Sequence, residues 1–515
     1  MREQLLARAG NDSPGLLFED ASWTWAEVVH ESCVRAAVLQ TLLPAGDPPH
    51  VGVLLENVPE FAFLLGGAAL GGSVVVGLNP TRRGAALAAD VRRADVQVVV
   101  TDAAHADLLA DVDVPVLPLE CPDWGALLDE HAEAAVPDVE VGPDDLMMLI
   151  FTSGTSGDPK AVNVTQAKVA LPGQFLSERF GLGPRDVAYV SMPMFHSNAI
   201  MAGWGPALAA GATVALARRF SASGFLPDVR RYAATYANYV GKPLTYIMAT
   251  PERPDDADNP LRLVFGNEAN DRDIDAFGRR FGCVVVDSYS STENAVIVQR
   301  VPEMPPGSLG RPLDGVRVLD PETMAETPDA VFDESGSLLN AEEATGELVN
   351  TTGAGAFAGY YKDPDAEAER MRGGMYWSGD LAYRDADGFV YFAGRIADWL
   401  RVDGENLAAA PIERVLLRHP SVSEAAVYAV PDEAVGDQVM AALVVHDGLE
   451  PEGFEEFLAG QPDLSTKAWP RYVRLVSTLP RTATNKVLKR TLAADGPVAG
   501  DGVLWTRDAR GTAYH

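Results

Sequence analysis

An alternation of strand-like and helix-like runs near the N-terminus most constrains how this 515-residue chain can fold. Residues 50–55, 74–78 and 96–101 are short, apolar and rich in Val, as buried strands are. Between them, residues 59–70 and 83–94 have the length and composition of helices, and the first of these begins with proline. This order predicts a parallel sheet with helical crossovers.

The same order recurs further along the chain. Residues 187–191 are strand-like, residues 199–210 are apolar, and residues 211–216 end in another Val-containing run. We therefore expect two similar α/β subdomains. Short alternating runs between residues 306 and 361, such as 315–320, predict a small β-rich subdomain after them.

A further change of pattern follows Gly394-Arg395. Residues 410–418 read as a helix, and residues 422–430 and 438–445 read as strands. We predict an α/β fold with a large N-terminal domain, residues 1–393, and a small mobile α+β lid, residues 396–515.

Composition excludes several classes of partner. The formal net charge of −32 repels phosphate backbones and anionic lipid, which argues against nucleic-acid and membrane partners. The uncharged stretch 61–78 contains five glycines and reads as helix, turn and strand, not as a membrane span.

Cys33, Cys121 and Cys283 have no metal-ligand or disulfide spacing, and the N-terminus has no signal-peptide pattern. We expect a cytoplasmic protein.

The strongest chemical signal is residues 151–160, Phe-Thr-Ser-Gly-Thr-Ser-Gly-Asp-Pro-Lys, directly after an apolar strand-like run. Glycines and hydroxyl residues after a strand form loops whose backbone N–H groups surround polyphosphates, and Lys160 adds a positive charge. The stretch is not a Walker A loop, because Pro159 stands where that motif requires Gly. It is not a nucleophile elbow, because Asp158 replaces the second glycine of that motif.

This stretch resembles the phosphate loop of the adenylate-forming superfamily, which contains acyl-CoA ligases, luciferases and peptide-synthetase adenylation domains. The resemblance extends over nearly the whole chain, and three stretches (220–223, 236–243 and 401–406) resemble the fatty-acyl and very-long-chain acyl-CoA ligase branch. Its other motifs follow in order: an adenine and magnesium motif at 289–293, a ribose motif at 376–380, a hinge at Gly394-Arg395 with Asp398, and a catalytic-lysine motif at 480–486.

The resemblance implies roles for residues of the N-terminal domain. Glu293 is expected to bind Mg²⁺, which prefers hard oxygen ligands, and Thr292 to bond the α-phosphate of ATP. Tyr289 is expected to stack on adenine, Asp287 to contact its amino group, and His196 to border the acyl pocket. The residues expected to hold the phosphates are Thr152, Ser153, Gly154, Thr155, Ser156, Gly157 and Lys160.

The remaining implied roles fall later in the chain. Asp380 is expected to accept two ribose hydroxyl groups with its two oxygens, and Arg395 to supply a cation near ribose and phosphate. Lys486 is expected to be the catalytic cation that bridges the attacking carboxylate and the α-phosphate. In the family, the residue two positions after the hinge arginine is often polar or charged, whereas here it is Ala397, which leaves the exact pivot open.

These motifs imply an ATP- and Mg²⁺-dependent acid–CoA ligase that works in two steps. The acid first forms an acyl-AMP with release of pyrophosphate, and the lid then rotates about Ala397-Asp398 so that coenzyme A, the co-substrate, attacks. One alternative is an enzyme that adenylates nitrite to diazotise an aromatic amine. A second is an inactive nucleotide-binding regulator, against which Lys486, Glu293 and Asp380 argue.

A departure from the family pattern concerns the acid. The family usually reads Tyr-Gly-x-Thr-Glu-Gly at the adenine motif, and here Ser290 and Asn294 occupy the two glycine positions. We expect Asn294 to narrow the acyl tunnel and to place there an amide that methylenes would leave unsatisfied. This predicts a small or polar acid.

Overall fold

The computed structural model describes residues 1–45, 47–152, 159–269, 271–333, 338–395, 399–402, 405–432, 436–446, 448–461, 464, 466–481, 487–500, 502–508 and 511–515. The chain divides into two compact units. The first contains Met1–Asn294 and Ala356–Glu369, and the second contains Ala295–Gly355 and Arg370–His515. Phosphate-loop residues 153–158, hinge residues 396–398 and Lys486 lie outside the described residues.

One sheet of the first unit contains the N-terminal strand runs. Its order is β6-β5-β3-β4-β7-β8, and every neighbouring pair is parallel except β7 with β8. The helices α3 and α4 connect its successive parallel strands, as the sequence predicts. The bounds are β3 His50–Leu54, α3 Pro59–Gly71, β4 Val74–Gly77, α4 Gly84–Arg93, β5 Val98–Thr101, β6 Val116–Pro118, β7 Leu146–Thr152 and β8 Lys160–Thr165.

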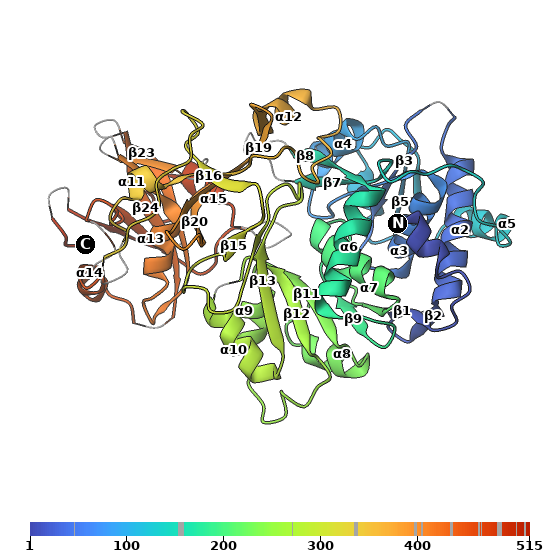
Figure 1. Ribbon diagram of the computed structural model, residues 1–515, viewed down its shortest axis with the longest axis horizontal. Helices are drawn as coiled ribbons and strands as arrows, with labels where there is room; N and C mark the ends of the chain where they lie inside the picture. Colours follow the sequence, from blue (N-terminus) through green and yellow to red (C-terminus); the bar gives the residue numbers. More distant parts are fainter. Residues whose placement is uncertain are drawn as a thin grey trace. The chain divides into compact units, whose positions relative to one another are not determined.

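A second sheet of this unit has a similar central strand order, and its strands β9, β11, β12 and β13 are labelled in Figure 1. Its strands run in the order β13-β12-β11-β9-β10-β1-β2, and only β1 with β2 is antiparallel. The central order β11-β9-β10 matches β5-β3-β4, which confirms two similar α/β subdomains. The bounds are β1 Pro14–Phe18, β2 Ala21–Thr24, β9 Val187–Val190, β10 Thr213–Leu216, β11 Tyr236–Val240, β12 Leu263–Asn267 and β13 Val284–Tyr289.

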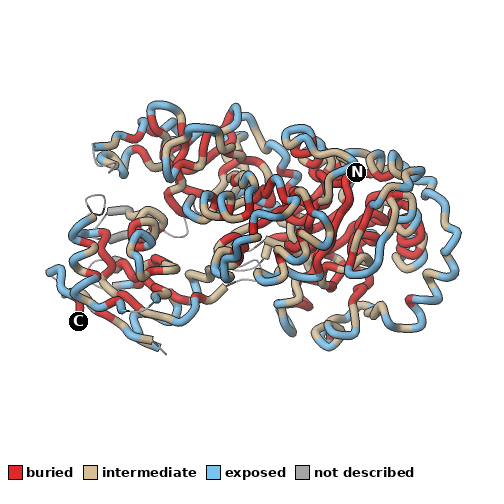
Figure 2. The backbone as a smooth tube through the Cα atoms, turned by 90° about the horizontal axis from the view of Figure 1, so that it is seen from below, coloured by how far each residue is buried: buried red, intermediate tan, exposed pale blue. Residues whose placement is uncertain are grey.

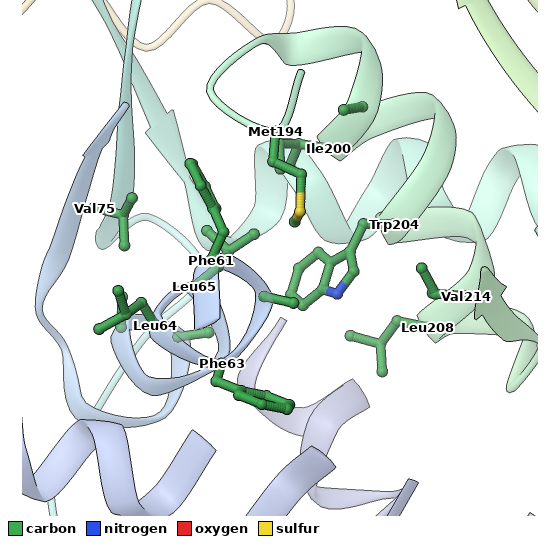
Figure 3. Close-up of a cluster of buried hydrophobic side chains, with 14 of the residues drawn as sticks. Phe61, Phe63, Leu64, Leu65, Val75, Met194, Ile200, Trp204, Leu208 and Val214 are labelled. Atoms are coloured by element: carbon green, nitrogen blue, oxygen red, sulfur yellow. The ribbon is translucent and has the colours of Figure 1, made fainter. Parts of the chain in front are cut away.

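Equivalent crossovers of the two subdomains share one hydrophobic core. Helix α3 contributes Phe61 and Leu64, and the crossover between β9 and β10 contributes Trp204 and Leu208 (Figure 3). That crossover begins as a π-helix, η2 (Ala199–Trp204), and continues as α7 (Gly205–Ala210). The apolar stretch 61–78 is thus a buried helix, turn and strand. No helix of the described residues is long and apolar enough to cross a membrane.

Local signals fix the ends of the helices around these sheets. Thr24 and Glu27 form a capping box at the start of α2, and α3 begins at Pro59 and ends at Gly72 in the left-handed conformation. The remaining helices of this unit are α1 Arg2–Leu6, α2 Trp25–Leu42, η1 Ala106–Leu109, α5 Pro122–Glu130, α6 Gln166–Phe180, α8 Phe225–Arg231, α9 Pro243–Met248 and α10 Asp271–Phe281.

The second unit is β-rich at its start and α+β at its end, and buried stretches fill the interior of each part (Figure 2). One sheet has the order β16-β17-β19-β18, with β20 beside β19, and β14 pairs with β15. These elements are β14 Val298–Gln299, β15 Arg311–Pro312, β16 Val316–Leu319, α11 Ala341–Ala344, β17 Gly346–Asn350, β18 Met371–Arg372, β19 Met375–Arg384 and β20 Val390–Arg395. Helix α12, Pro364–Arg370, precedes β18 in sequence, and its residues up to Glu369 belong to the first unit.

The last sheet of the second unit has the order β22-β21-β24-β25-β26, with β23 beside β24. The α+β pattern predicted after Gly394-Arg395 is present, and the ends of α13, β23 and β24 lie within two residues of those expected from sequence. The bounds are β21 Trp399–Val402, β22 Glu405–Ala408, α13 Ala409–Leu416, β23 Val422–Asp432, β24 Gly436–Val445, α14 Pro451–Ala459, β25 Tyr472–Val476, α15 Lys489–Asp495 and β26 Val503–Thr506.

Candidate active site

The loop that carries His196 follows β9 and is held by a buried asparagine. The side-chain amide of Asn57 donates to the carbonyl oxygens of Met192 at 2.9 Å and Ala217 at 3.1 Å. Its own oxygen accepts from the backbone N–H of Met194 at 2.8 Å. Asn57 is buried, so these three bonds are shielded from water and fix the start of the His196 loop.

The end of the same loop joins the adenine motif. His196 Nδ1 accepts from the backbone N–H of Asn198 at 3.3 Å, and the Asn198 amide donates to the carbonyl of Tyr239 at 2.8 Å. The hydroxyl groups of Ser197 and Thr292 lie 3.0 Å apart and are buried. The structure therefore brings His196 and Thr292, which are far apart in sequence, into one hydrogen-bonded region of the first unit.

Asp287 lies on β13 and is held by donors from two neighbouring elements. The Tyr239 hydroxyl on β11 donates to Asp287 Oδ2 at 2.6 Å, and the backbone N–H of Ala269 donates to the same oxygen at 3.0 Å. The carboxylate is buried, so both bonds restrict its orientation. Tyr289, the last residue of the strand, is half-buried. Tyr239 and Asp287 are far apart along the chain, and no sequence motif links them.

Glu293 is a buried carboxylate with a partner that sequence reasoning missed. The hydroxyl of Tyr360 donates to Glu293 Oε1 at 2.8 Å. Lys168, on the first turn of α6, is also buried and interacts electrostatically with Glu293. Burial lowers the pKa of Lys168 from 10.5 to about 8, although the charge of Glu293 opposes that shift. Lys168 stands in an ordinary helical pattern, which in sequence does not single it out.

The donor set fits a magnesium ion shared with ATP. Among the described residues, no group of three or more His, Cys, Asp or Glu side chains could hold a metal ion by itself. Mg²⁺ is commonly bound by one or two carboxylates together with substrate phosphates. Glu293 offers a hard oxygen donor of this kind, and Tyr360 restricts its rotation.

The ends of the phosphate loop are described, whereas Ser153, Gly154, Thr155, Ser156 and Gly157 lie outside the described residues. Thr152 is the last residue of β7, and its hydroxyl contacts the carbonyl oxygen of Lys160 at 3.5 Å. Lys160 opens β8, and its side chain is buried. Its Nζ lies 3.0 Å from Glu369 Oε2 and 5.4 Å from the ring centre of Tyr360.

In the second unit, the ribose motif is held by a buried carboxylate. The backbone N–H of Gly379 donates to Glu347 Oε1 at 2.6 Å, and Arg372 contacts Glu347 Oε2 at 2.6 Å. Burial raises the pKa of Glu347, and the bond from Gly379 and the charge of Arg372 oppose that shift. The neighbouring Asp380 is buried and stands opposite Arg395 in the register of β19 and β20.

Comparisons with known proteins agree with these motifs. The AMP-binding enzyme family matches residues 3–361, and the AMP-binding enzyme C-terminal domain matches residues 411–486. The chain is 54% identical over 496 residues, 96% of each chain, to a medium/long-chain-fatty-acid–CoA ligase of Mycobacterium marinum. It is 51% identical over 497 residues, 95% of this chain and 89% of the relative, to a steroid-22-oyl-CoA synthetase of Rhodococcus jostii.

A solved structure is similar over the same length. ATP-bound MatB from Rhodopseudomonas palustris has a TM-score of 0.82 and 26% identity, covering 96% of this chain and 99% of that one. The close relatives are named for CoA ligation, which supports acid–CoA ligation over nitrite activation or an inactive regulator. The chain therefore belongs to the AMP-binding enzyme family and is an AMP-forming acid–CoA ligase that uses ATP, magnesium and coenzyme A.

Proposed function

We propose that this ligase activates an apolar carboxylic acid, with a fatty acid of medium to long chain as its principal substrate. The observation that carries the proposal is the 54% identity, over 96% of both chains, to a ligase named for medium- and long-chain fatty acids. The buried apolar segment after the His196 loop, which includes Ala199, Ala202 and Gly203 in a π-helix, is compatible with an apolar acyl group. π-Helices are frequent at functional sites.

The expectation of a small or polar acid has two arguments, a narrowed tunnel and an unsatisfied amide, and the structure weakens the second. It assumed that the Asn294 amide would be unsatisfied beside a chain of methylenes. The Ser290 hydroxyl donates to Asn294 Oδ1 at 3.0 Å, so the carbonyl end of that amide is satisfied within the motif itself. Asn294 also has a φ of 55°, a left-handed conformation that Asn adopts more readily than most residues. Its presence at a glycine position therefore has a backbone explanation.

A steroid side-chain acid is the second candidate. The relative from Rhodococcus jostii, named steroid-22-oyl-CoA synthetase, is 51% identical over 95% of this chain. Both candidates are apolar carboxylic acids. They differ in width, because a fused ring system is far broader than a polymethylene chain.

In the proposed first step, the acid carboxylate attacks the α-phosphorus of ATP and pyrophosphate leaves. Lys486 stabilises the charge that develops, and Thr292 bonds the α-phosphate. Glu293 holds magnesium, which when bound neutralises phosphate charge. Asp287 and Tyr289 bind adenine, and the residues that hold the phosphates are 152–157 with Lys160.

In the proposed second step, the thiol of coenzyme A attacks the acyl carbonyl and AMP leaves. Asp380 and Arg395 hold the ribose through both steps, and His196 borders the acyl group. We retain the division into an N-terminal domain, 1–393, and a lid, 396–515, whose rotation about residues 397–398 removes Lys486 before thiol attack. We also propose a cytoplasmic location, which fits the three free cysteines.

Competition among acids tests the substrate proposal. Pyrophosphate release and acyl-CoA formation are measured for butyrate, octanoate, dodecanoate, palmitate, a steroid-22-oic acid, benzoate and cinnamate. Each buried methylene contributes about 0.8 kcal/mol, so kcat/KM should rise about fourfold per methylene until the pocket is filled. A preference for the steroid acid would favour the second candidate, and a preference for butyrate or benzoate would contradict both.

A further inference from the structure

Tyr360 belongs to a short segment that is attached to strand β8 by its backbone. Tyr360 pairs with Val162 in an antiparallel bridge, and the N–H of Tyr361 donates to the Ala161 carbonyl at 2.8 Å. Asn163 donates from its backbone N–H to the Gly359 carbonyl at 3.1 Å and from its side chain to the Ala358 carbonyl at 2.9 Å. These bonds fix the backbone on both sides of Tyr360, so they also fix the position from which its side chain extends.

The bend before Tyr360 requires glycine. Gly359 has a φ of 85°, and a Cβ there would lie 2.6 Å from Glu367 Oε2. The Tyr360 side chain is buried between two charged groups of the nucleotide motifs: its hydroxyl bonds Glu293, and Lys160 Nζ lies 5.4 Å from its ring centre. A cation over an aromatic face is attracted to it. Tyr360 thus contacts residues from both the phosphate and the magnesium motif.

We propose that Tyr360 is a positioning residue for the magnesium site, whose hydroxyl fixes the Glu293 carboxylate in the orientation that receives the MgATP complex. This inference rests on the proposed role of Glu293 as the magnesium ligand. A free carboxylate must lose rotational freedom when it binds a metal, whereas one already held by a buried hydrogen bond loses less. Removing the hydroxyl therefore weakens metal binding while the fold and the acid pocket remain intact.

The test compares Tyr360→Phe with Tyr361→Phe. Tyr361 is the matched control, because its hydroxyl donates to a different carboxylate, Asp95, at 2.7 Å. One readout is the Mg²⁺ concentration that gives half-maximal ATP–pyrophosphate exchange. The other does not depend on turnover: Mn²⁺ binding to the protein with a non-hydrolysable ATP analogue, followed by electron paramagnetic resonance.

We expect Tyr360→Phe to weaken both Mg²⁺ use and Mn²⁺ binding by about tenfold, with the KM of the acid unchanged, and Tyr361→Phe to match the wild type. Wild-type metal binding in Tyr360→Phe would overturn the inference. Equal losses of metal binding in both variants would also overturn it, because they would show that the segment has only a structural role. Glu293→Gln separates the two proposals. If it leaves metal binding unchanged, the role of Glu293 itself is wrong, whereas a loss in Glu293→Gln without one in Tyr360→Phe refutes only the role of Tyr360.

Discussion

Replacing Glu347 with Gln should weaken ATP binding by disturbing the ribose motif. The Glu347 side chain is only 2% exposed, accepts a hydrogen bond from the backbone of Gly379 and pairs with Arg372. Gln keeps the size of the side chain and one acceptor oxygen. Its NH₂ group, however, would face the Arg372 guanidinium, so that two donors would oppose each other.

The magnitude follows from the burial of each partner. Removing one partner of a fully buried ion pair costs about 3–5 kcal/mol. Two effects make the loss of stability smaller here. Arg372 is 33% exposed, so water can hydrate its charge when Glu347 is replaced. The variant also no longer buries the Glu347 charge, whose burial is unfavourable and raises the pKa of that carboxyl group. We expect a net loss of about 1–2 kcal/mol in the stability of the ordered segment that carries Asp380. Because ATP binding must then restore this order, the KM for ATP should rise about 5- to 30-fold.

Comparison of ATP with 2′-deoxy-ATP distinguishes an effect on the position of Asp380 from a nonspecific loss of folded structure. If Glu347 acts by orienting the segment of Asp380, the preference for ATP over the deoxynucleotide should fall in Glu347→Gln, because that preference depends on the ribose hydroxyl groups. Glu326→Gln is the control, since Glu326 pairs with Arg384 at the surface, where such pairs contribute about 0–1 kcal/mol. An unchanged preference, or an equal change in the control, would refute the reasoning.

Three further predictions concern single residues. Lys486→Ala should slow adenylation about 10²- to 10³-fold while thioester formation from supplied acyl-AMP persists, and equal losses in both steps would contradict its role. Tyr239→Phe should raise the KM for ATP about tenfold without changing that of the acid, because Asp287 loses a buried donor; steady-state kinetics with each substrate varied checks this. The lowered pKa of Lys168 means that the folded protein binds fewer protons than the unfolded chain between about pH 8 and 10.5, so stability should rise with pH there. The Tm of the wild type minus that of Lys168→Met should therefore increase from about pH 7.5 to about pH 9.5, and a constant difference would count against the shift.

The sequence predicted the fold closely because its signals are local and repeated. Val-rich runs and the intervening helices identify β3, α3, β4 and their counterparts β9, η2 with α7, and β10. It did not predict the π-helical start of the second crossover, because an i→i+5 turn leaves no periodicity distinct from that of a buried α-helix. Nor did it predict the shared strand order of the two sheets, which depends on long-range pairing.

Candidate site residues can be identified from sequence where they stand within a motif. Residues that hydrogen-bond to a motif from a distant part of the chain cannot be identified in this way. Glu293 and Asp380 stand in recognisable strings, whereas Tyr360 and Glu347, which bond to these motifs, are separated from them in sequence. Such supporting contacts depend on which strands and segments become neighbours. An isolated Tyr or Glu in sequence gives no indication of them, since most occurrences of either are structural.

Asn294 illustrates how a residue at a family glycine position can have an explanation in backbone conformation as well as one in side-chain size. A glycine position in a family motif can be required for space or for a positive φ, and a sequence alone does not distinguish the two. Here φ is 55°, and the backbone N–H of Asn294 donates to the Ser291 carbonyl in a turn that a left-handed residue completes. Asn is among the few residues that tolerate this conformation, and Ser290, in the other glycine position, bonds its side chain. The two departures thus stabilise each other within the turn, and the positive φ explains Asn294 without reference to the width of the acyl pocket.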